Sequence, residues 1–240
     1  AGGLGPHAAA THAPRTYVLV DTLGYGASDD APEMLTVEDH AEALLAVVDA
    51  LGFDKVSLLG HLTGAYIAME FAIGHPHRVR SLVLAGMVFF DEQLRKSLRD
   101  WTESQAAPDH SNPQFLVDMW KKRADYGDQR LNLRCVRDEL RSGSHEGHGH
   151  ASVAHYRMDK RMALLTSRTL LVRGKIMMKR IDAIGWKMSD NVHRIDEAIP
   201  HAKVHIVDDG DMLMCNKMAP TLATLVNDFL SADGTCGSAP

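Results

Sequence analysis

Residues 56–69, Val-Ser-Leu-Leu-Gly-His-Leu-Thr-Gly-Ala-Tyr-Ile-Ala-Met, decide the fold of this chain. The apolar run at 56–59 predicts a buried strand, and the apolar spacing after Gly64 predicts a helix to about residue 73. Gly60 and Gly64 flank the turn, where glycine allows a sharp change of direction and a close approach of helix to strand. A strand, a sharp turn and a helix form the setting of the G-x-S-x-G motif, whose central serine is a nucleophile. Leu62 occupies that central position here, and leucine has no nucleophilic atom.

Length, charge and cysteine content restrict the classes of protein to which the chain can belong. Its 240 residues fit one large domain with an inserted subdomain, and its net charge of −5 predicts neither a nucleic-acid nor a membrane partner. No apolar run approaches the roughly 18 residues needed to span a bilayer, and no signal peptide is visible. The three cysteines lie far apart, which favours a reducing, cytoplasmic location over a disulfide framework.

Apolar runs and helical patterns alternate along most of the chain. The predicted strands are five short apolar runs, at residues 17–20, 56–59, 81–85, 169–174 and 203–207. Helical patterns separate or follow most of them, at residues 36–51, 65–73, 190–199 and 219–229. This alternation predicts an α/β fold with a mostly parallel sheet and helices on both faces.

The middle third of the chain has a different character. Residues 89–165 are richer in charge, lack strand-like runs and contain three helical patterns, at 92–103, 113–126 and 131–140. We therefore predict a core made of residues 1–88 and 166–240, into which a helical cap of residues 89–165 is inserted. The cap should stand at the carboxyl ends of the strands, where ligands bind in sheets of this kind.

Several motifs, in order, resemble those of the α/β-hydrolase superfamily, in its lid-bearing branch of epoxide hydrolases and lactonases. Residues 21–28 resemble its D-x-x-G-x-G-x-S loop, and residues 60–65 resemble its G-H-S-x-G-A elbow. Residues 75–84 resemble the segment after the elbow helix. Residues 169–175 resemble the strand before the catalytic acid, and residues 207–214 the loop of the catalytic histidine. The resemblance covers nearly the whole chain and implies this fold with an inserted cap.

The departures from the family fall at its three catalytic positions. Leu62 stands in place of the nucleophile, Ile176 in place of the acid and Asp211 in place of the histidine. The resemblance therefore predicts a degenerate triad that cannot form an acyl-enzyme. Residues 1–3 resemble the H-G-G oxyanion loop of the family without its histidine, so the backbone N–H groups of Gly3 and Thr63 are the expected oxyanion donors.

Asp211 is the leading candidate for a catalytic residue. A carboxylate beneath an apolar lid can act as a general acid or base, and the alternative is a solvated residue in an acidic turn. Leu62, Ile176 and Met212 are expected to form an apolar substrate-binding wall, although core packing explains the aliphatic side chains equally well.

Histidines are numerous and need separate interpretation. His61 directly precedes the turn apex and is expected to pack beneath the turn, with a role as base as the alternative. His145 and His148 lie in a glycine-rich loop that offers a metal no supporting shell, so neither a metal site nor a cofactor is predicted. His155 and Tyr156 lie near the end of the predicted cap, where we expect one of them to contact the ligand.

Three functional hypotheses follow. The first is an enzyme of this fold without hydrolytic activity, which promotes cyclisation, addition, isomerisation or lyase chemistry on a small apolar metabolite, in secondary metabolism, by acid/base assistance. The second is a catalytically inactive ligand-binding or partner protein, and the third is a hydrolase with relocated catalytic residues. The expected partner is a small apolar molecule, and a homodimer is an open alternative to a monomer.

Overall fold

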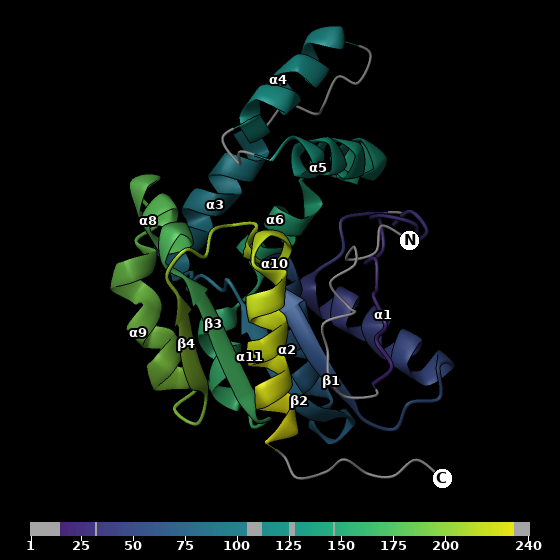
Figure 1. The fold of residues 1–240 in the computed structure, drawn as a ribbon, viewed down its shortest axis with the longest axis vertical. Coiled ribbons are helices and arrows are strands. Elements are labelled where there is room, and N and C mark those ends of the chain that lie inside the picture. The colour runs from purple at the N-terminus through teal and green to yellow at the C-terminus, as the bar shows by residue number, and fades with distance from the viewer. Residues whose placement is uncertain (1–14, 32, 105–111, 125–127, 146, 233–240) are drawn as a thin grey trace.

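The computed structural model describes residues 15–31, 33–104, 112–124, 128–145 and 147–232. Within these residues, four parallel strands form one sheet in sequential order (Figure 1): β1 Val56–His61, β2 Val79–Ala85, β3 Thr169–Gly174 and β4 Lys203–Val207. Leu59 lies opposite Val83 in the register of the sheet, and Val172 lies opposite His205.

Helices connect and cover the strands. In chain order they are α1 Val37–Ala50, α2 Thr63–Gly74, α3 Glu92–Ser104, α4 Pro113–Ala124, α5 Gln129–Ser142, α6 His148–His155, α7 Met158–Arg161, α8 Lys175–Ala183, α9 Met188–Ala198, α10 Met214–Lys217 and α11 Ala219–Ser231. Short 3-10 helices cover Pro76–Arg78, Gly143–His145 and Met162–Leu164.

Neighbouring residues of the central strands enter two different cores, one on each face of the sheet. Leu84 of β2 packs in a cluster with Met69 of α2, whereas the adjacent Val83 packs in a second cluster with Phe229 of α11. This alternation is the period of a strand whose two faces are both covered. The prediction of an α/β fold with a parallel sheet and helices on both faces is confirmed.

The first helix begins where its capping residues predict. The Thr36 side chain accepts a hydrogen bond from the Asp39 N–H, and the Asp39 carboxylate accepts one from the Thr36 N–H, which completes a capping box. Gly52 follows the helix with a φ of +70°, a conformation that glycine adopts without steric cost.

The chain between β2 and β3 is helical in its described part. Helices α3, α4 and α5 extend away from the sheet (Figure 1), close to the ranges expected from sequence. Helix α6 begins at His148, a residue that we predicted to lie in a glycine-rich loop. The division into a core and an inserted cap domain remains a prediction.

The predicted strand at residues 17–20 is wrong. This segment has no strand partner in the described structure, and its four apolar side chains are 40% to 52% exposed. The sequence pattern identifies an apolar extended segment, but a strand also needs a neighbour with which to pair. A second difference is α8, which follows β3 directly and includes residues 176–178, for which no helix was predicted.

Among the described residues, none of the helices combines the length and the apolar character that crossing a bilayer requires. The cytoplasmic location remains a prediction.

Candidate functional site

The candidate residues lie at or shortly after the carboxyl ends of the four strands. His61 ends β1, Gly86 follows β2, Gly174 ends β3, and Asp211 lies in the loop after β4. The strands are parallel, so these ends share one edge of the sheet, which is where open α/β sheets bind ligands. The fold therefore brings Leu62 and Asp211 to one edge of the sheet, and their role in a site stays a prediction.

The turn between β1 and α2 is tight and depends on glycine. A Cβ atom at Gly60 would lie 2.1 Å from the Gly64 carbonyl oxygen, so only glycine fits beneath the helix. At the apex, Leu62 has φ 51° and ψ −120°, a conformation that is strained for a residue with a side chain. Its N–H donates to the Ala85 carbonyl at 3.0 Å, which ties the apex to the end of β2.

Apolar side chains surround this apex. A Cβ atom added at Gly86 would lie 3.1 Å from Leu62 Cδ2 and 3.2 Å from Met177 Sδ, so both side chains reach the same spot. Ile176, beside Met177 in the first turn of α8, is 37% exposed. Met212 is partly buried against the core. Leu62 and Met177 thus form an apolar surface at the apex, and the predicted substrate wall of Leu62, Ile176 and Met212 stays a prediction.

Of the two predicted oxyanion donors, Thr63 lies among the described residues. Thr63 is the first residue of α2, and the first N–H groups of a helix have no acceptor within it. Such groups can stabilise a developing negative charge. Gly3 lies outside the described residues.

Asp211 is buried and its carboxylate has two donors. The side chain accepts the Leu213 N–H at 2.7 Å and pairs with Lys217 Nζ at 2.7 Å. The residue is 6% exposed, in contrast to the solvated turn residue that the sequence left as the alternative. Asp211 thus forms a buried ion pair with Lys217 at the strand ends, and its catalytic role stays a prediction.

His61 has the most unusual environment in this group. Burial lowers the pKa of its imidazole to about 4, while the nearby Asp211 carboxylate acts in the opposite direction. The imidazole is therefore neutral at pH 7, and its buried Nε2 has no hydrogen-bond partner among the described residues. In the tautomer that carries its proton on Nδ1, Nε2 has a free lone pair and can accept a proton. The sequence places His61 beside the apex, but the burial that keeps its imidazole neutral becomes visible only in the fold.

The two residues predicted at the end of the cap have different environments. Tyr156 is 2% exposed, and its hydroxyl donates to Glu70 Oε2 at 2.6 Å. Burial and the Glu70 carboxylate raise its pKa, so the phenol is neutral. His155 is exposed at the end of α6. Ligand contact by either residue stays a prediction.

The histidine-rich segment is a structural connection in the described structure. The Tyr25 hydroxyl donates to the His145 carbonyl at 2.8 Å and accepts the Gly149 N–H at 2.8 Å, which joins the loop after residue 20 to α6. No group of three or more His, Cys, Asp or Glu side chains in the described ranges is arranged to hold a metal ion.

Fold and site together define a protein of the α/β-hydrolase class, and comparison with known proteins agrees. The chain belongs to the α/β hydrolase fold family, whose sequence profile matches residues 3–217. It is 27% identical over 229 residues to 2-hydroxymuconate semialdehyde hydrolase of Pseudomonas putida. The matched region covers 90% of this chain and 77% of that protein.

Other relatives match shorter stretches or share the fold alone. A 2-hydroxy-6-oxononadienedioate/2-hydroxy-6-oxononatrienedioate hydrolase of Klebsiella pneumoniae is 44% identical over 70 residues, which are 29% of this chain and only 24% of that protein. Among solved structures, MenH from S. aureus superposes with a TM-score of 0.70 at 16% identity, over 90% of this chain and 83% of that one. The enol-lactonase of Burkholderia xenovorans LB400 superposes with a TM-score of 0.66 at 17% identity, over 88% of this chain and 79% of that one.

These relatives correct the first functional hypothesis. The predicted non-hydrolytic activity, with cyclase or lyase chemistry in secondary metabolism, is wrong, because the relatives are named as hydrolases. The error came from equating the absence of a nucleophile at Leu62 with the absence of hydrolysis. A hydrolase can also use water as the nucleophile when a base activates it. The degenerate triad itself remains a prediction.

Proposed function

We propose that this protein is a hydrolase of small carbonyl compounds that uses His61 as the base for a water nucleophile. Membership of the α/β hydrolase fold family and the hydrolase names of its relatives support the reaction class. The observation that carries the assignment of the base is the buried, neutral His61 imidazole, whose Nε2 lacks a partner in the described structure.

The proposed reaction uses groups at the carboxyl ends of the strands. His61 Nε2 accepts a proton from water while the water oxygen attacks the carbonyl carbon of the substrate. The Thr63 N–H stabilises the oxyanion of the resulting tetrahedral intermediate. The intermediate then collapses, and the imidazolium returns its proton to the leaving group. The bond to the leaving group breaks as the carbonyl re-forms.

Asp211 has a supporting role in this proposal. Its carboxylate favours the protonated form of His61 and so stabilises the imidazolium that forms during the reaction. Lys217 and the Leu213 N–H hold the carboxylate in place. The apolar side chains of Leu62, Ile176 and Met212 suit a substrate whose non-reacting part is apolar.

The test compares wild type with His61→Asn in the hydrolysis of 2-hydroxymuconate semialdehyde and of 4-nitrophenyl acetate. Loss of a general base lowers kcat/KM by roughly 100-fold or more. The matched control is His77→Asn, because His77 is exposed far from the strand ends at the other end of α2. This control should retain the wild-type rate.

The pH profile separates a base with the lowered pKa of His61 from a histidine base with an ordinary pKa. Because the pKa of His61 is held to about 4, wild-type kcat/KM should stay constant between pH 7.5 and 5.5. A histidine with an ordinary pKa near 6.5 would lose most of its activity over that range. Equal rates for wild type and His61→Asn would exclude His61 as the base, and no turnover of either compound by wild type would overturn the hydrolase proposal.

A further inference from the structure

The outward side of α5 combines positive charge with exposed leucines. Helical spacing places six residues on this side, which we call the α5 face: Arg130, Leu133, Arg134, Arg137, Leu140 and Arg141. The first four of them line a hollow of about 340 Å³. Leu133 is 61% exposed and Leu140 is 37% exposed. Cationic and apolar side chains therefore share one side of a single helix.

The inward side of α5 buries polar side chains although leucines lie outside. Asn132 and Glu139 are 3% and 8% exposed, far less than Leu133. Leu131 and Val136 also pack inward, which fixes the orientation of the helix. Single exposed apolar residues are ordinary on protein surfaces. Two leucines that lie seven residues apart among arginines are instead a pattern that suits an interface with both charged and apolar parts.

The arginines of the α5 face are poorly neutralised. Among the described residues, Arg130, Arg134 and Arg141 have no acidic partner. Arg137 pairs with Asp138 at 3.3 Å, and both side chains of this pair are exposed, so the pair is weak. The net charge of −5, from which we predicted no membrane partner, describes the whole chain. Charges more than about 8 Å away are largely screened at physiological salt, so a partner meets a locally positive surface.

Helix α4 brings more apolar surface to the same end of the molecule. It packs beside α5, where Asn132 Nδ2 donates to the Trp120 carbonyl at 3.3 Å. Leu116, Val117 and Trp120 of α4 are 45%, 45% and 38% exposed. Both helices lie at one end of the long axis of the molecule, away from the sheet (Figure 1). A flat partner can therefore contact these helices without contacting the sheet.

We propose that the α5 face docks this protein on an anionic lipid bilayer. The arginines contact lipid phosphates, while Leu133 and Leu140 enter the boundary between the headgroups and the acyl chains. The exposed apolar side chains of α4 add to this contact. The proposal does not depend on the proposed hydrolysis.

Charge and apolar exposure together favour a bilayer over other occupants. A second copy of the chain, docked through the same face about a two-fold axis, would place arginines against arginines. A nucleic acid or an acidic peptide satisfies the charge but gives the exposed leucines no apolar environment. An anionic bilayer supplies both kinds of contact at one flat surface.

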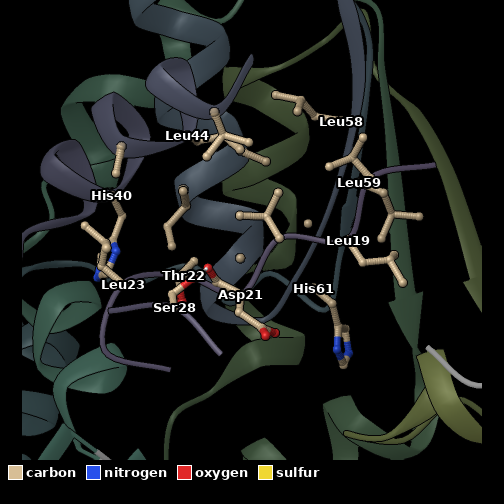
Figure 2. A pocket seen from close by; sticks show the side chains of 18 of the residues that line it. Leu19, Asp21, Thr22, Leu23, Ser28, His40, Leu44, Leu58, Leu59 and His61 are labelled. Carbon is tan, nitrogen blue, oxygen red and sulfur yellow. Dashed lines mark hydrogen bonds between the residues drawn. The ribbon is translucent and has the colours of Figure 1, made fainter. Parts of the chain in front are cut away.

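One arginine of the α5 face also borders a second hollow. Arg134 lines a larger hollow beside β1, of about 740 Å³, which His61 also lines (Figure 2). A substitution of Arg134 would therefore affect the surroundings of the candidate site as well as the α5 face. Arg130 and Arg137 line the smaller hollow and not the larger one, so they are the arginines to substitute.

The test measures co-sedimentation of the full 240-residue chain with lipid vesicles. Vesicles of phosphatidylcholine alone are compared with vesicles that also contain phosphatidylglycerol, at roughly 0.1 M salt. Wild type should bind the mixed vesicles and not the neutral ones. Arg130→Gln and Arg137→Gln should each lower the partition constant about fivefold, and Leu133→Gln should lower it about tenfold.

Matched substitutions on other surfaces are the controls. Arg80→Gln removes an exposed arginine of β2, and Leu164→Gln removes a leucine that is 55% exposed before β3. Both variants should bind the mixed vesicles like wild type. All five substituted side chains are exposed, so the variants should fold, which thermal unfolding checks.

Failure of wild type to bind the mixed vesicles, or equal binding to both kinds of vesicle, would overturn the proposal. Equal losses in the control variants would also overturn it, because the contact would then lie elsewhere. Poly-L-glutamate and a short DNA duplex serve as soluble polyanions. Binding to either one that equals vesicle binding and is unchanged in Leu133→Gln would assign the α5 face to such a partner instead. A dimer that Leu133→Gln dissociates would assign it to a second copy of the chain.

Discussion

At the scale of single residues, two side chains occupy backbone conformations that normally favour glycine. Among the described non-glycine residues, Leu62 has φ 51° and Lys187 has φ 46°, and each directly precedes a helix. The left-handed conformation costs a residue with a Cβ atom about 1–2 kcal/mol. At Leu62 the conformation belongs to the sharp turn at the candidate site, whereas Lys187 is an exposed residue before α9.

Replacing Lys187 should therefore stabilise the protein. Lys187→Gly relieves the steric cost, and part of this gain is offset by the greater freedom of glycine in the unfolded chain, so we expect a gain of about 0.5–1 kcal/mol in the free energy of unfolding. Urea unfolding measures it. The same substitution at Lys179, an exposed position inside α8, should instead cost about 1 kcal/mol. Loss of stability in both variants would show that the φ of Lys187 carries no strain.

The sequence located the residues of the candidate site better than it described their chemistry. Leu62 and Asp211 could be placed by motif alone, because glycine spacing and apolar runs are local properties. The neutral state of His61 could not be predicted, because the pKa depends on burial by segments distant in sequence. The ion pair of Asp211 with Lys217 was missed although the two residues are six apart, because that pair depends on the turn into α10.

At the scale of elements, a buried ion pair joins α2 to the end of the helical segment between β2 and β3. Arg161 of α7 donates to both carboxylate oxygens of Glu70, and Tyr156 donates to the same carboxylate. The Glu70 side chain is only 7% exposed. The sequence did not reveal this pair, since Glu70 is one acidic residue within an apolar helix. The prediction of a strand at residues 17–20 failed for a related reason. Whether an apolar segment forms a strand depends on a pairing partner, and the local sequence does not show that partner.

Removing the cation of this pair should destabilise the protein strongly. Arg161→Met leaves the Glu70 carboxylate buried with the Tyr156 hydroxyl as its remaining donor in the described contacts, at a cost on the order of 3 kcal/mol. Arg157→Met, which breaks an exposed pair with Asp159, should cost less than about 1 kcal/mol. Chemical denaturation measures both. The double variant Glu70→Leu with Arg161→Met should recover much of the loss, and a double variant no more stable than Arg161→Met would contradict this explanation.

At the scale of the whole molecule, buried neutral histidines make stability depend on pH. Burial lowers the pKa of His61 to about 4 and also lowers the pKa of His40. In the unfolded chain both imidazoles titrate near 6.5. As pH falls below 6.5, the unfolded state binds protons before the folded state does. The free energy of unfolding therefore decreases as pH falls, until the folded His61 itself becomes protonated near pH 4.

The size of this effect can be assigned to His61 by substitution. A pKa difference of this size corresponds to about 3 kcal/mol between pH 7 and pH 4, since each unit contributes about 1.4 kcal/mol. His61→Asn removes the titrating group, so the free energy of unfolding should decline much less over that range than in wild type. Asp39 and Asp159, whose pKa values are lowered from a normal value of 3.8, contribute mainly below this window. Urea midpoints at pH 7, 5.5 and 4.5 measure the slope, with His77→Asn expected to follow wild type. If His61→Asn and wild type lose the same stability, the protons that destabilise the protein bind to other groups. His61 would then have a pKa near 6.5 in the folded protein, and the basis for its proposed role as a neutral base would be lost.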